Sequence, residues 1–255
     1  MSPFLTGKTV LLTRPRRQAA ESRPLFEAEG AKVLIQPVQE ILPAETLDPG
    51  VIAPEALRAA DCVIFSSANG VFFFLEALRA ADRDGGGRLI LLRKIPLAAV
   101  GPGTERELNR AGFHVSVVPP LHSAEGLLDV LKEEARRGKH FLSVRGDRGR
   151  NVLKEGLAAA GGSIAEISVY RAEEIKKPDA EIVRLMDSGK IDYTLVTSSA
   201  TAAGVVRLFG KSLCRTTLVS ISPLTGTALK EAGYPAAFQA TEATVEGMLD
   251  ALRRA

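Results

Sequence analysis

The sequence predicts an α/β protein made of two similar domains, each with a mostly parallel sheet flanked by helices. Three observations support this fold class. Short apolar runs alternate with amphipathic stretches of roughly ten residues, which is the pattern of βαβ units. Glycines follow several of the amphipathic stretches, where they act as helix stop signals. Finally, long segments of the first half of the chain recur in the second half.

Individual elements follow from local pattern along the first half of the chain. Apolar runs such as TVLL and CVIF predict buried strands, because short runs bounded by turn residues are typical of parallel sheets. Strands are expected at 9–12, 32–35, 62–65, 97–100, 113–118 and 140–144. Helices are expected at 18–29, 69–79, 104–111 and 124–137, with Gly30, Gly112 and Gly138 ending three of them.

An internal duplication is the most informative feature. Asp192 lies 131 positions after Asp61, and the segments DCVIFSSA and DYTLVTSSA that begin at these aspartates correspond. The three blocks 8–41, 61–79 and 95–137 recur as 139–172, 192–209 and 216–254. A period above 100 residues predicts two domains, since solenoid repeats span about 20–50 residues. We expect the two halves to face one another across a cleft, where ligands bind near the carboxyl ends of the strands.

Composition excludes several classes of protein. The 255 residues are 45% hydrophobic and 25% charged, and the net charge is only +3, which argues against a nucleic-acid protein held by a broad basic field. The start of the chain has no signal-peptide pattern, and no apolar run approaches the ~20 residues of a membrane span. Cys62 and Cys214 are too few for a zinc site or a disulfide scaffold. A cytoplasmic protein without a metal or other cofactor is expected.

Six predicted strand-to-helix turns carry small, hydroxyl-bearing or basic residues. They are 13–15 (TRP), 66–70 (SSANG), 101–104 (GPGT), 145–147 (RGD), 197–199 (TSS) and 222–225 (SPLT). Helix N-termini bind anions, so six such turns favour a polyanionic ligand. Any single Ser or Thr there is also explained as a helix cap, and this alternative stays open. The candidate binding residues are Thr13, Arg14, Ser66, Ser67, Asn69, Gly101, Thr104, Arg145, Thr197, Ser198, Ser199, Ser222 and Thr225.

Other chemical signals are weak. GPGTER at 101–106 has Arg106 where a dinucleotide fingerprint needs its third glycine, and no P-loop motif appears. Tyr170 ends a predicted strand where the first repeated block finishes. Its phenol is either packed for structural reasons or presented to the cleft as a weak acid.

With these residues in hand, the chain resembles the uroporphyrinogen-III synthase family over nearly its whole length. The resemblance rests on the order and spacing of motifs more than on any one of them. The motifs are VLLTRP, DCVIFSSANGV, AVGPGTERELNRAGF, SAEGLL, LSVRGDRGRNVLKEGLAAAG, VYRAEE, IDYTLVTSSAT and ISPLTGTALKEAGY.

The resemblance implies two α/β domains joined by a two-stranded linker. The first domain would be discontinuous, comprising 1–38 and 173–255, and the second would span 41–169. Linker strands are expected at about 36–41 and 168–172, where the first block of each repeat ends.

The implied reaction is cyclisation of linear hydroxymethylbilane, with inversion of ring D and loss of water. Tyr170 matches the family tyrosine proposed to help the hydroxyl leave. Hydroxyl positions of the family cleft match Thr104, Ser199 and Thr225, its strand-end turn matches Ser66 and Ser67, and its basic turn residues match Arg14 and Arg145. The family's substrate contacts use mainly backbone N–H groups. A monomer is expected, with the upstream hydroxymethylbilane synthase as a candidate partner.

Two other functions compete with this one. A two-lobed binding protein would hold a small polyanion without chemistry, and a transferase of nucleotide or sugar phosphates would use a doubly wound fold. The missing third glycine and the absent P-loop weigh against the transferase. Fold analogy alone does not choose among the three, whereas the residue-level resemblance favours the synthase.

Overall fold

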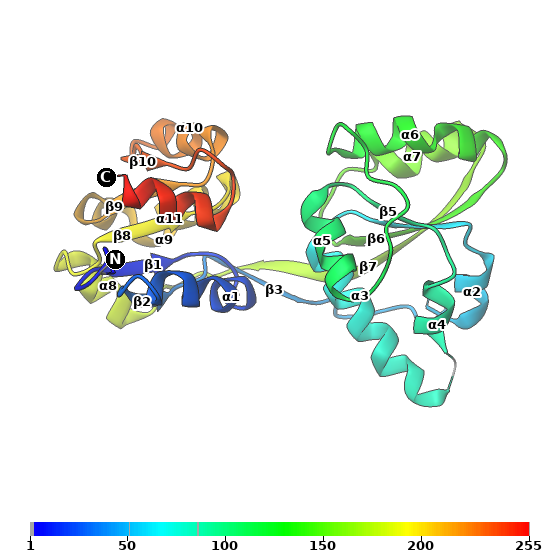
Figure 1. The fold of residues 1–255 in the computed structure, drawn as a ribbon, viewed down its shortest axis with the longest axis horizontal. Coiled ribbons are helices and arrows are strands. Elements are labelled where there is room, and N and C mark those ends of the chain that lie inside the picture. Colours follow the sequence, from blue (N-terminus) through cyan, green and yellow to red (C-terminus); the bar gives the residue numbers. More distant parts are fainter. Residues whose placement is uncertain (1–2, 51, 86, 255) are drawn as a thin grey trace. The chain divides into compact units, whose positions relative to one another are not determined.

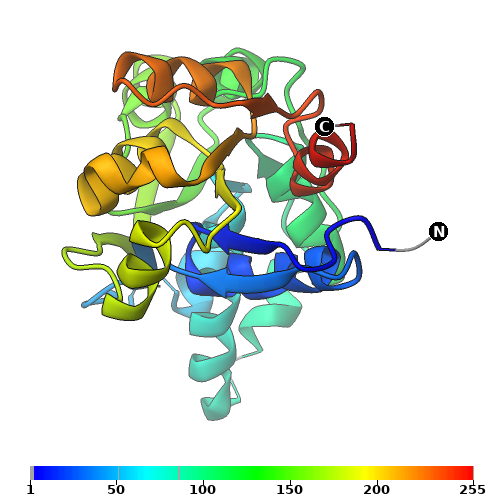
Figure 2. The same cartoon turned by 90° about the vertical axis from the view of Figure 1, so that its left-hand side faces the viewer.

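The chain is described here by a computed structural model that covers residues 3–50, 52–85 and 87–254. It divides into two compact units, which we call unit 1 (Met1–Glu40 and Glu173–Ala255) and unit 2 (Ile41–Ala172). The blue N-terminal segment and the yellow-to-red C-terminal segment therefore belong to the same unit (Figure 1, Figure 2). Two strands run across the unit boundaries, β3 (Gln39–Pro43) and β7 (Ser163–Glu174).

Unit 1 is built on a five-stranded sheet with the order β10-β9-β8-β1-β2, and its paired strands are all parallel. Its strands are β1 (Thr9–Leu12), β2 (Lys32–Ile35), β8 (Tyr193–Val196), β9 (Thr217–Ser220) and β10 (Phe238–Gln239). Its helices are α1 (Arg16–Glu27), α8 (Ala180–Asp187), α9 (Ser199–Phe209), α10 (Pro223–Glu231) and α11 (Val245–Arg253), with a 3₁₀ turn at Gly210–Arg215.

Strand β1 shows why unit 1 has two hydrophobic layers. Successive side chains of a strand point to opposite faces of the sheet. Val10 and Leu12 pack into a cluster with residues of α1 and α11, whereas Leu11 packs into a second cluster with residues of α8, α9 and α10. Since both faces are covered by helices, the strand reads as a continuous apolar run in the sequence.

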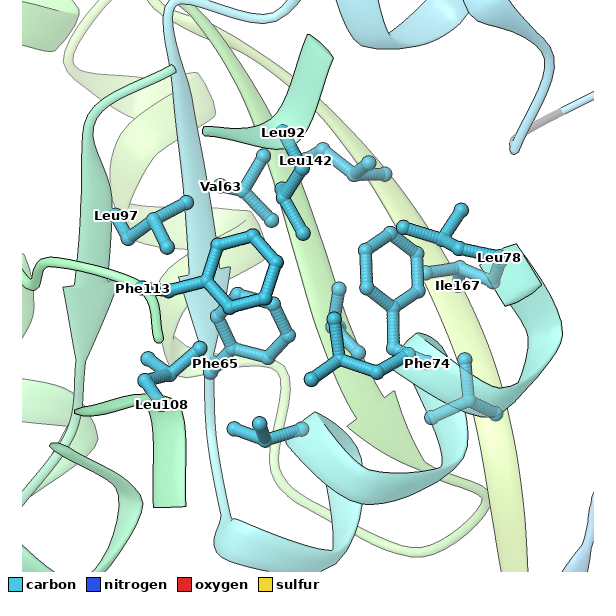
Figure 3. Packing of buried hydrophobic residues seen from close by; sticks show 14 of the residues in the cluster. Val63, Phe65, Phe74, Leu78, Leu92, Leu97, Leu108, Phe113, Leu142 and Ile167 are labelled. Carbon is cyan, nitrogen blue, oxygen red and sulfur yellow. The ribbon is translucent and has the colours of Figure 1, made fainter. Parts of the chain in front are cut away.

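Unit 2 has the sheet order β3-β7-β6-β4-β5. Its other strands are β4 (Cys62–Phe65), β5 (Leu97–Ala99) and β6 (His140–Gly146). Its helices are α2 (Pro54–Ala59), α3 (Ala68–Ala81), α4 (Arg88–Leu92), α5 (Pro102–Arg110), α6 (Ala124–Arg136) and α7 (Val152–Ala159), with a 3₁₀ turn at Asp82–Asp84. Figure 3 shows the cluster on one face of this sheet, in which Phe65 of β4 meets Phe74 of α3 edge to face with ring centroids 5.6 Å apart.

The duplication in the sequence corresponds to equivalent strand registers in the two units. In unit 1, Val10 of β1 pairs with Tyr193 of β8, and in unit 2 the equivalent Phe141 of β6 pairs with Cys62 of β4. Equivalent registers also relate β1–β2 to β6–β7 and β8–β9 to β4–β5. Each unit therefore joins the first block of one repeat to the second and third blocks of the other.

The aspartates that mark the duplication have the same structural role in both units. Asp192 accepts hydrogen bonds from the backbone N–H of Thr9 at 2.8 Å and from Lys8 Nζ at 3.0 Å. Its equivalent Asp61 accepts from the N–H of His140 at 2.9 Å and from Lys139 Nζ at 2.8 Å. These two hydrogen bonds hold the pKa of the Asp61 carboxyl below its ordinary value. Each carboxylate thus fixes the start of the neighbouring strand.

The prediction of a strand at 113–118 is wrong. Only Val117 pairs there, in an isolated parallel bridge with Ala98. The same bridge recurs in unit 1, where Phe238 pairs with Val219, and there the pairing continues for one more residue to form β10. The other expected strands and helices form, with ends that shift by a few residues; the helix expected at 18–29, for example, is α1 at Arg16–Glu27. The strands expected as linkers at 36–41 and 168–172 correspond to β3 at Gln39–Pro43 and to the longer β7 at Ser163–Glu174.

Candidate active site

A cavity of about 250 Å³ lies in unit 2 where β4, β5 and β6 end. These three strands are parallel neighbours, so their carboxyl ends share one edge of the sheet, the usual place for ligands in such folds. Eight of the lining residues are polar, and they come from the turn after β4, from β6 and the loop that follows it, and from β7. They are Ser66, Ser67, Ser143, Arg145, Arg148, Arg150, Glu166 and Tyr170.

Tyr170 is fixed in this cavity by three neighbours. Its hydroxyl lies 3.0 Å from the Oγ of Ser67, and its ring stacks on Phe73 with centroids 6.0 Å apart. Gly146 lies opposite Tyr170 in the β6–β7 pairing, after a register shift between Arg145 and Gly146. A Cβ at position 146 would approach the Cζ of Tyr170 to 2.6 Å, so only glycine leaves room for the ring.

Ser67 also begins helix α3. It is the N-cap residue, and its Oγ accepts a hydrogen bond from the backbone N–H of Gly70 at 3.1 Å. Serine is favoured at this position because its oxygen satisfies a helix N–H group that has no partner within the helix. The same oxygen therefore joins the N-terminus of α3 to the phenol of Tyr170.

The cavity is basic. Arg145 forms an ion pair with Glu166 at 2.9 Å and donates to the Oδ1 of Asn151 at 3.2 Å. Arg148 lies 4.0 Å from Asp147, and Arg150 forms an ion pair with Glu125. The side chains of Arg148 and Arg150 are 68% and 70% exposed, respectively. Because exposed ion pairs contribute little net free energy, a ligand carboxylate can exchange for these partners at small cost.

Four of the predicted site residues meet in this cavity, namely Ser66, Ser67, Arg145 and Tyr170. The sequence reading missed Arg148, Arg150, Glu166 and Gly146, although the RGDRGR run after the strand at 140–144 carried a signal for three of them. Asn69, Gly101 and Thr104 belong to unit 2 but do not line the cavity. Asn69 lies in the first turn of α3, Gly101 is the N-cap of α5, and Thr104 is buried in the first turn of α5.

The remaining predicted residues lie in unit 1, and two of them cap helices. Ser198 caps α9 by accepting from the N–H of Thr201 at 3.0 Å, and Ser222 caps α10 by accepting from the N–H of Thr225 at 3.4 Å. Thr197 and Ser199 flank Ser198 and are half-buried. Thr13 and Thr225 are almost fully buried, and the hydroxyl of Thr13 donates to the carbonyl of Leu195.

Arg14 is the unit 1 equivalent of Arg145, and its surroundings differ. It donates to the Oγ of Ser22 at 2.9 Å and to the Oε1 of Gln18 at 3.3 Å, both of which are neutral. Its buried Nε has no hydrogen-bond partner among the residues that the structure describes. Burial lowers the pKa of this guanidinium from its ordinary value. An anion placed beside Arg14 would relieve that cost of burial.

The described residues show neither a metal centre nor a membrane span. Nowhere in the described ranges do three or more His, Cys, Asp or Glu side chains gather in a way that could hold a metal ion. Cys62 is buried, and burial raises the pKa of its thiol to about 12. Among the helices that are described, none is long and apolar enough to cross a membrane.

Comparison with known proteins identifies the family. Residues 20–250 match the family profile described as uroporphyrinogen-III synthase HemD. The uroporphyrinogen-III synthase of Chlorobaculum parvum is 30% identical over 80% of each chain, and a relative from Methanothermobacter thermautotrophicus is 32% identical over 94% of this chain and 96% of its own. A crystal structure of mutant uroporphyrinogen III synthase from the extremely thermophilic bacterium Thermus thermophilus has the same fold, with a TM-score of 0.61 at 20% identity over 97% of this chain and 98% of its own. The chain belongs to the uroporphyrinogen-III synthase family.

Proposed function

We propose that this protein closes linear hydroxymethylbilane into uroporphyrinogen III, and that the unit 2 cavity carries the step in which the substrate loses its hydroxyl. The observation that supports this location is the phenol of Tyr170, held in a basic cavity by Ser67, Phe73 and Gly146. A fixed phenol is a suitable general acid for a departing hydroxyl.

In the proposed step, the carbon–oxygen bond of the hydroxymethyl group breaks and the Tyr170 proton moves to the departing oxygen. The hydroxyl leaves as water, and the pyrrole nitrogen stabilises the cationic carbon as an azafulvene. The substituted α-carbon of ring D then attacks this carbon to form a spiro-pyrrolenine. The original bond between ring D and the methylene bridge to ring C breaks, and the free α-carbon of ring D attacks that methylene, which closes the macrocycle with ring D inverted. The final ring closure releases a proton from the attacking pyrrole carbon, and that proton restores the phenol of Tyr170.

The arginines of the cavity would hold the carboxylates of the substrate. Hydroxymethylbilane carries eight carboxylates, and the guanidinium groups of Arg145, Arg148 and Arg150 present donors suited to carboxylate oxygens. Cyclisation without an enzyme gives the isomer in which ring D is not inverted. The protein must therefore hold the chain so that the inverted closure is faster, which is catalysis by orientation.

In unit 1, the predicted contacts are the Arg14 guanidinium and the helix N-termini at Ser198 and Ser222. Both serine side chains accept N–H groups of their own helices, so a carboxylate there would bind mainly the other free N–H groups of the first turn. Thr13 and Thr225 have little exposed surface to offer a ligand. Their predicted roles in binding therefore rest on the backbone of their turns.

An isomer assay tests the proposed function. Hydroxymethylbilane is generated in situ, the protein is added, and the oxidised porphyrin isomers are separated. We expect isomer III to dominate. If isomer I stays dominant, the function is wrong, and a protein that binds the bilane without changing the isomer ratio would be the two-lobed binding protein.

Tyr170→Phe tests the role of the phenol. We expect kcat to fall by about ten- to hundredfold with KM little changed, because the proton donor is lost while the charged contacts stay. Tyr234→Phe, which removes the same atom from a tyrosine of unit 1, is the matched control and should keep the wild-type rate. An unchanged kcat in Tyr170→Phe would return Tyr170 to a structural role.

A further inference from the structure

The hydroxyl of Ser67 has a different partner from two N-cap hydroxyls of unit 1, that of its equivalent Ser198 and that of Ser222. Ser198 lies 2.8 Å from the hydroxyl of Thr201, and Ser222 lies 3.1 Å from the hydroxyl of Thr225. In both cases the N-cap serine meets a threonine three residues later in its own helix. Position 70, which corresponds to Thr201, is glycine, and Ser67 meets Tyr170 across 103 residues of sequence instead.

We infer that Ser67 is a positioning residue for the general acid Tyr170, and that the absence of a side-chain hydroxyl at Gly70 makes this possible; the inference rests on the function proposed above. A serine hydroxyl has one proton to donate and two lone pairs. The Oγ of Ser67 uses a lone pair to accept the Gly70 N–H. In the proposed arrangement Ser67 donates its own proton to the phenol oxygen, which leaves the Tyr170 proton free to point at the substrate.

The helix N-terminus strengthens this arrangement. Gly70 N–H lies in the first turn of α3, where unpaired N–H groups give the positive end of the helix dipole. A serine that accepts from this turn becomes a better donor, because successive hydrogen bonds polarise one another. As Tyr170 gives up its proton, the growing negative charge on its oxygen is met by the Ser67 hydroxyl at 3.0 Å. Ser67 thus acts through Tyr170 and needs no contact with the substrate.

Position 70 offers a matched pair of variants that leave Ser67 and Tyr170 in place. A Cβ at residue 70 would lie 3.4 Å from the Oγ of Ser67 and 3.5 Å from the carbonyl of Val144, which is ordinary contact, so alanine fits. Gly70→Ser adds a hydroxyl to the same Cβ and recreates the pairing of Ser198 with Thr201. We expect kcat of Gly70→Ser to be about three- to tenfold below that of Gly70→Ala, with KM alike in the two, because the new hydroxyl takes the Ser67 proton from Tyr170.

Variants of Ser67 separate positioning from helix capping. We expect Ser67→Ala to lower kcat about tenfold and Ser67→Thr, which keeps a capping hydroxyl, to restore most of the rate. In a Tyr170→Phe background, Ser67→Ala should cause no further loss beyond about twofold, since the two residues act as a unit. Thr244→Ala is the control for a lost cap, because Thr244 accepts the N–H of Gly247 at 2.9 Å and meets no tyrosine. It should lower stability and keep kcat.

A readout that does not use activity distinguishes failure of this inference from failure of the proposed function. In protein labelled with ¹³Cζ-tyrosine, the signal lost in Tyr170→Phe is that of Tyr170. It should shift in Ser67→Ala and Gly70→Ser and stay in place in Gly70→Ala. If the signal is the same in all three, or if Gly70→Ser and Gly70→Ala have equal kcat, the inference is overturned. If the signal shifts as expected but Tyr170→Phe keeps full activity, the proposed role of Tyr170 fails and the positioning role fails with it.

Discussion

Unit 1 and unit 2 share one arrangement of parallel strands. The equivalent strand pairs β1–β2 and β6–β7, however, end at different places. In unit 1, β1 and β2 pair as far as Leu12 and Ile35. In unit 2, β6 and β7 continue past the equivalent residues to Gly146 and Tyr170. The residue equivalent to Gly146 is Pro15, which has no N–H to donate and cannot extend a ladder. The longer pairing in unit 2 places Tyr170 opposite Gly146, where it lines the cavity.

The comparison shows how a duplicated scaffold acquires a local site. The buried strands and the anchoring aspartates are the same in both copies, since they stabilise the sheet. The differences gather at the carboxyl ends of the strands, where Gly70 replaces Thr201 and Gly146 replaces Pro15. Gly146 leaves room for the ring of Tyr170, whereas Gly70 lacks the hydroxyl that Thr201 offers to Ser198. The two units therefore differ at positions that surround Tyr170 and its partner Ser67.

Among the variants that test this difference between the units, Gly146→Ala should have the largest effect on kcat. The added Cβ would lie 2.6 Å from Cζ and 2.9 Å from the hydroxyl oxygen of Tyr170, so the ring must move. We expect kcat to fall about a hundredfold, because displacement of a catalytic group by about 1 Å has effects of that size. Kinetics with hydroxymethylbilane and thermal unfolding measure the two consequences separately. A wild-type kcat in a folded Gly146→Ala protein would show that the position of Tyr170 is not important.

Replacing Arg14 or Arg145 by Gln tests whether the two arginines contribute differently to substrate binding, as their different partners suggest. Arg14 donates to the neutral groups of Ser22 and Gln18, whereas Arg145 is already paired with Glu166. We expect Arg14→Gln to raise KM about tenfold with kcat within twofold, since a charged hydrogen bond to a carboxylate is lost. Arg145→Gln should raise KM less and lower stability more, because Glu166 loses its nearest partner.

Arg215→Gln, at an exposed position in the 3₁₀ turn Gly210–Arg215, removes the same charge away from any strand-end turn and serves as the control. It should leave KM unchanged. Equal effects of Arg14→Gln and Arg145→Gln on KM would contradict the electrostatic difference between the units.

Most of the fold was predictable because its central strands are buried on both faces. The strands at 9–12, 32–35 and 62–65 were predicted to the residue, since apolar runs bounded by turns leave little freedom in their limits. The segment at 113–118 looks equally apolar, but β5 offers it a short partner and only Val117 pairs. Strand formation at the edge of a sheet depends on the neighbouring strand, which local sequence does not describe.

The site was predictable in part, for a similar reason. Ser67 and Arg145 were identified because they follow predicted strands directly. Arg148 and Arg150 lie in a loop whose path over the cavity is set by tertiary contacts. The contact of Ser67 with Tyr170 joins residues 103 positions apart, and it depends on a glycine at position 70 that reads in sequence as an ordinary helix residue. No local pattern encodes such a contact.

Asp61→Asn should have the smallest effect, and that effect is on stability. It tests the aspartate anchor that both units share. The folded protein holds the pKa of Asp61 below its ordinary value of 3.8, chiefly through the N–H of His140 and the Lys139 ammonium. A lowered carboxyl pKa contributes stability above the unfolded pKa, and that contribution is lost as pH falls through the folded value. Asp61→Asn should therefore be less stable than wild type at pH 7, by at most about 1 kcal/mol for so exposed a group. Denaturant unfolding at several pH values should show the gap narrowing once pH falls below about 4 and closing as pH passes through the lowered folded pKa, because the Asp61 carboxyl is then protonated and neutral like the amide. A gap that stays constant from pH 7 to pH 3 would mean that packing or hydrogen-bond geometry, not the charge of Asp61, fixes the start of β6.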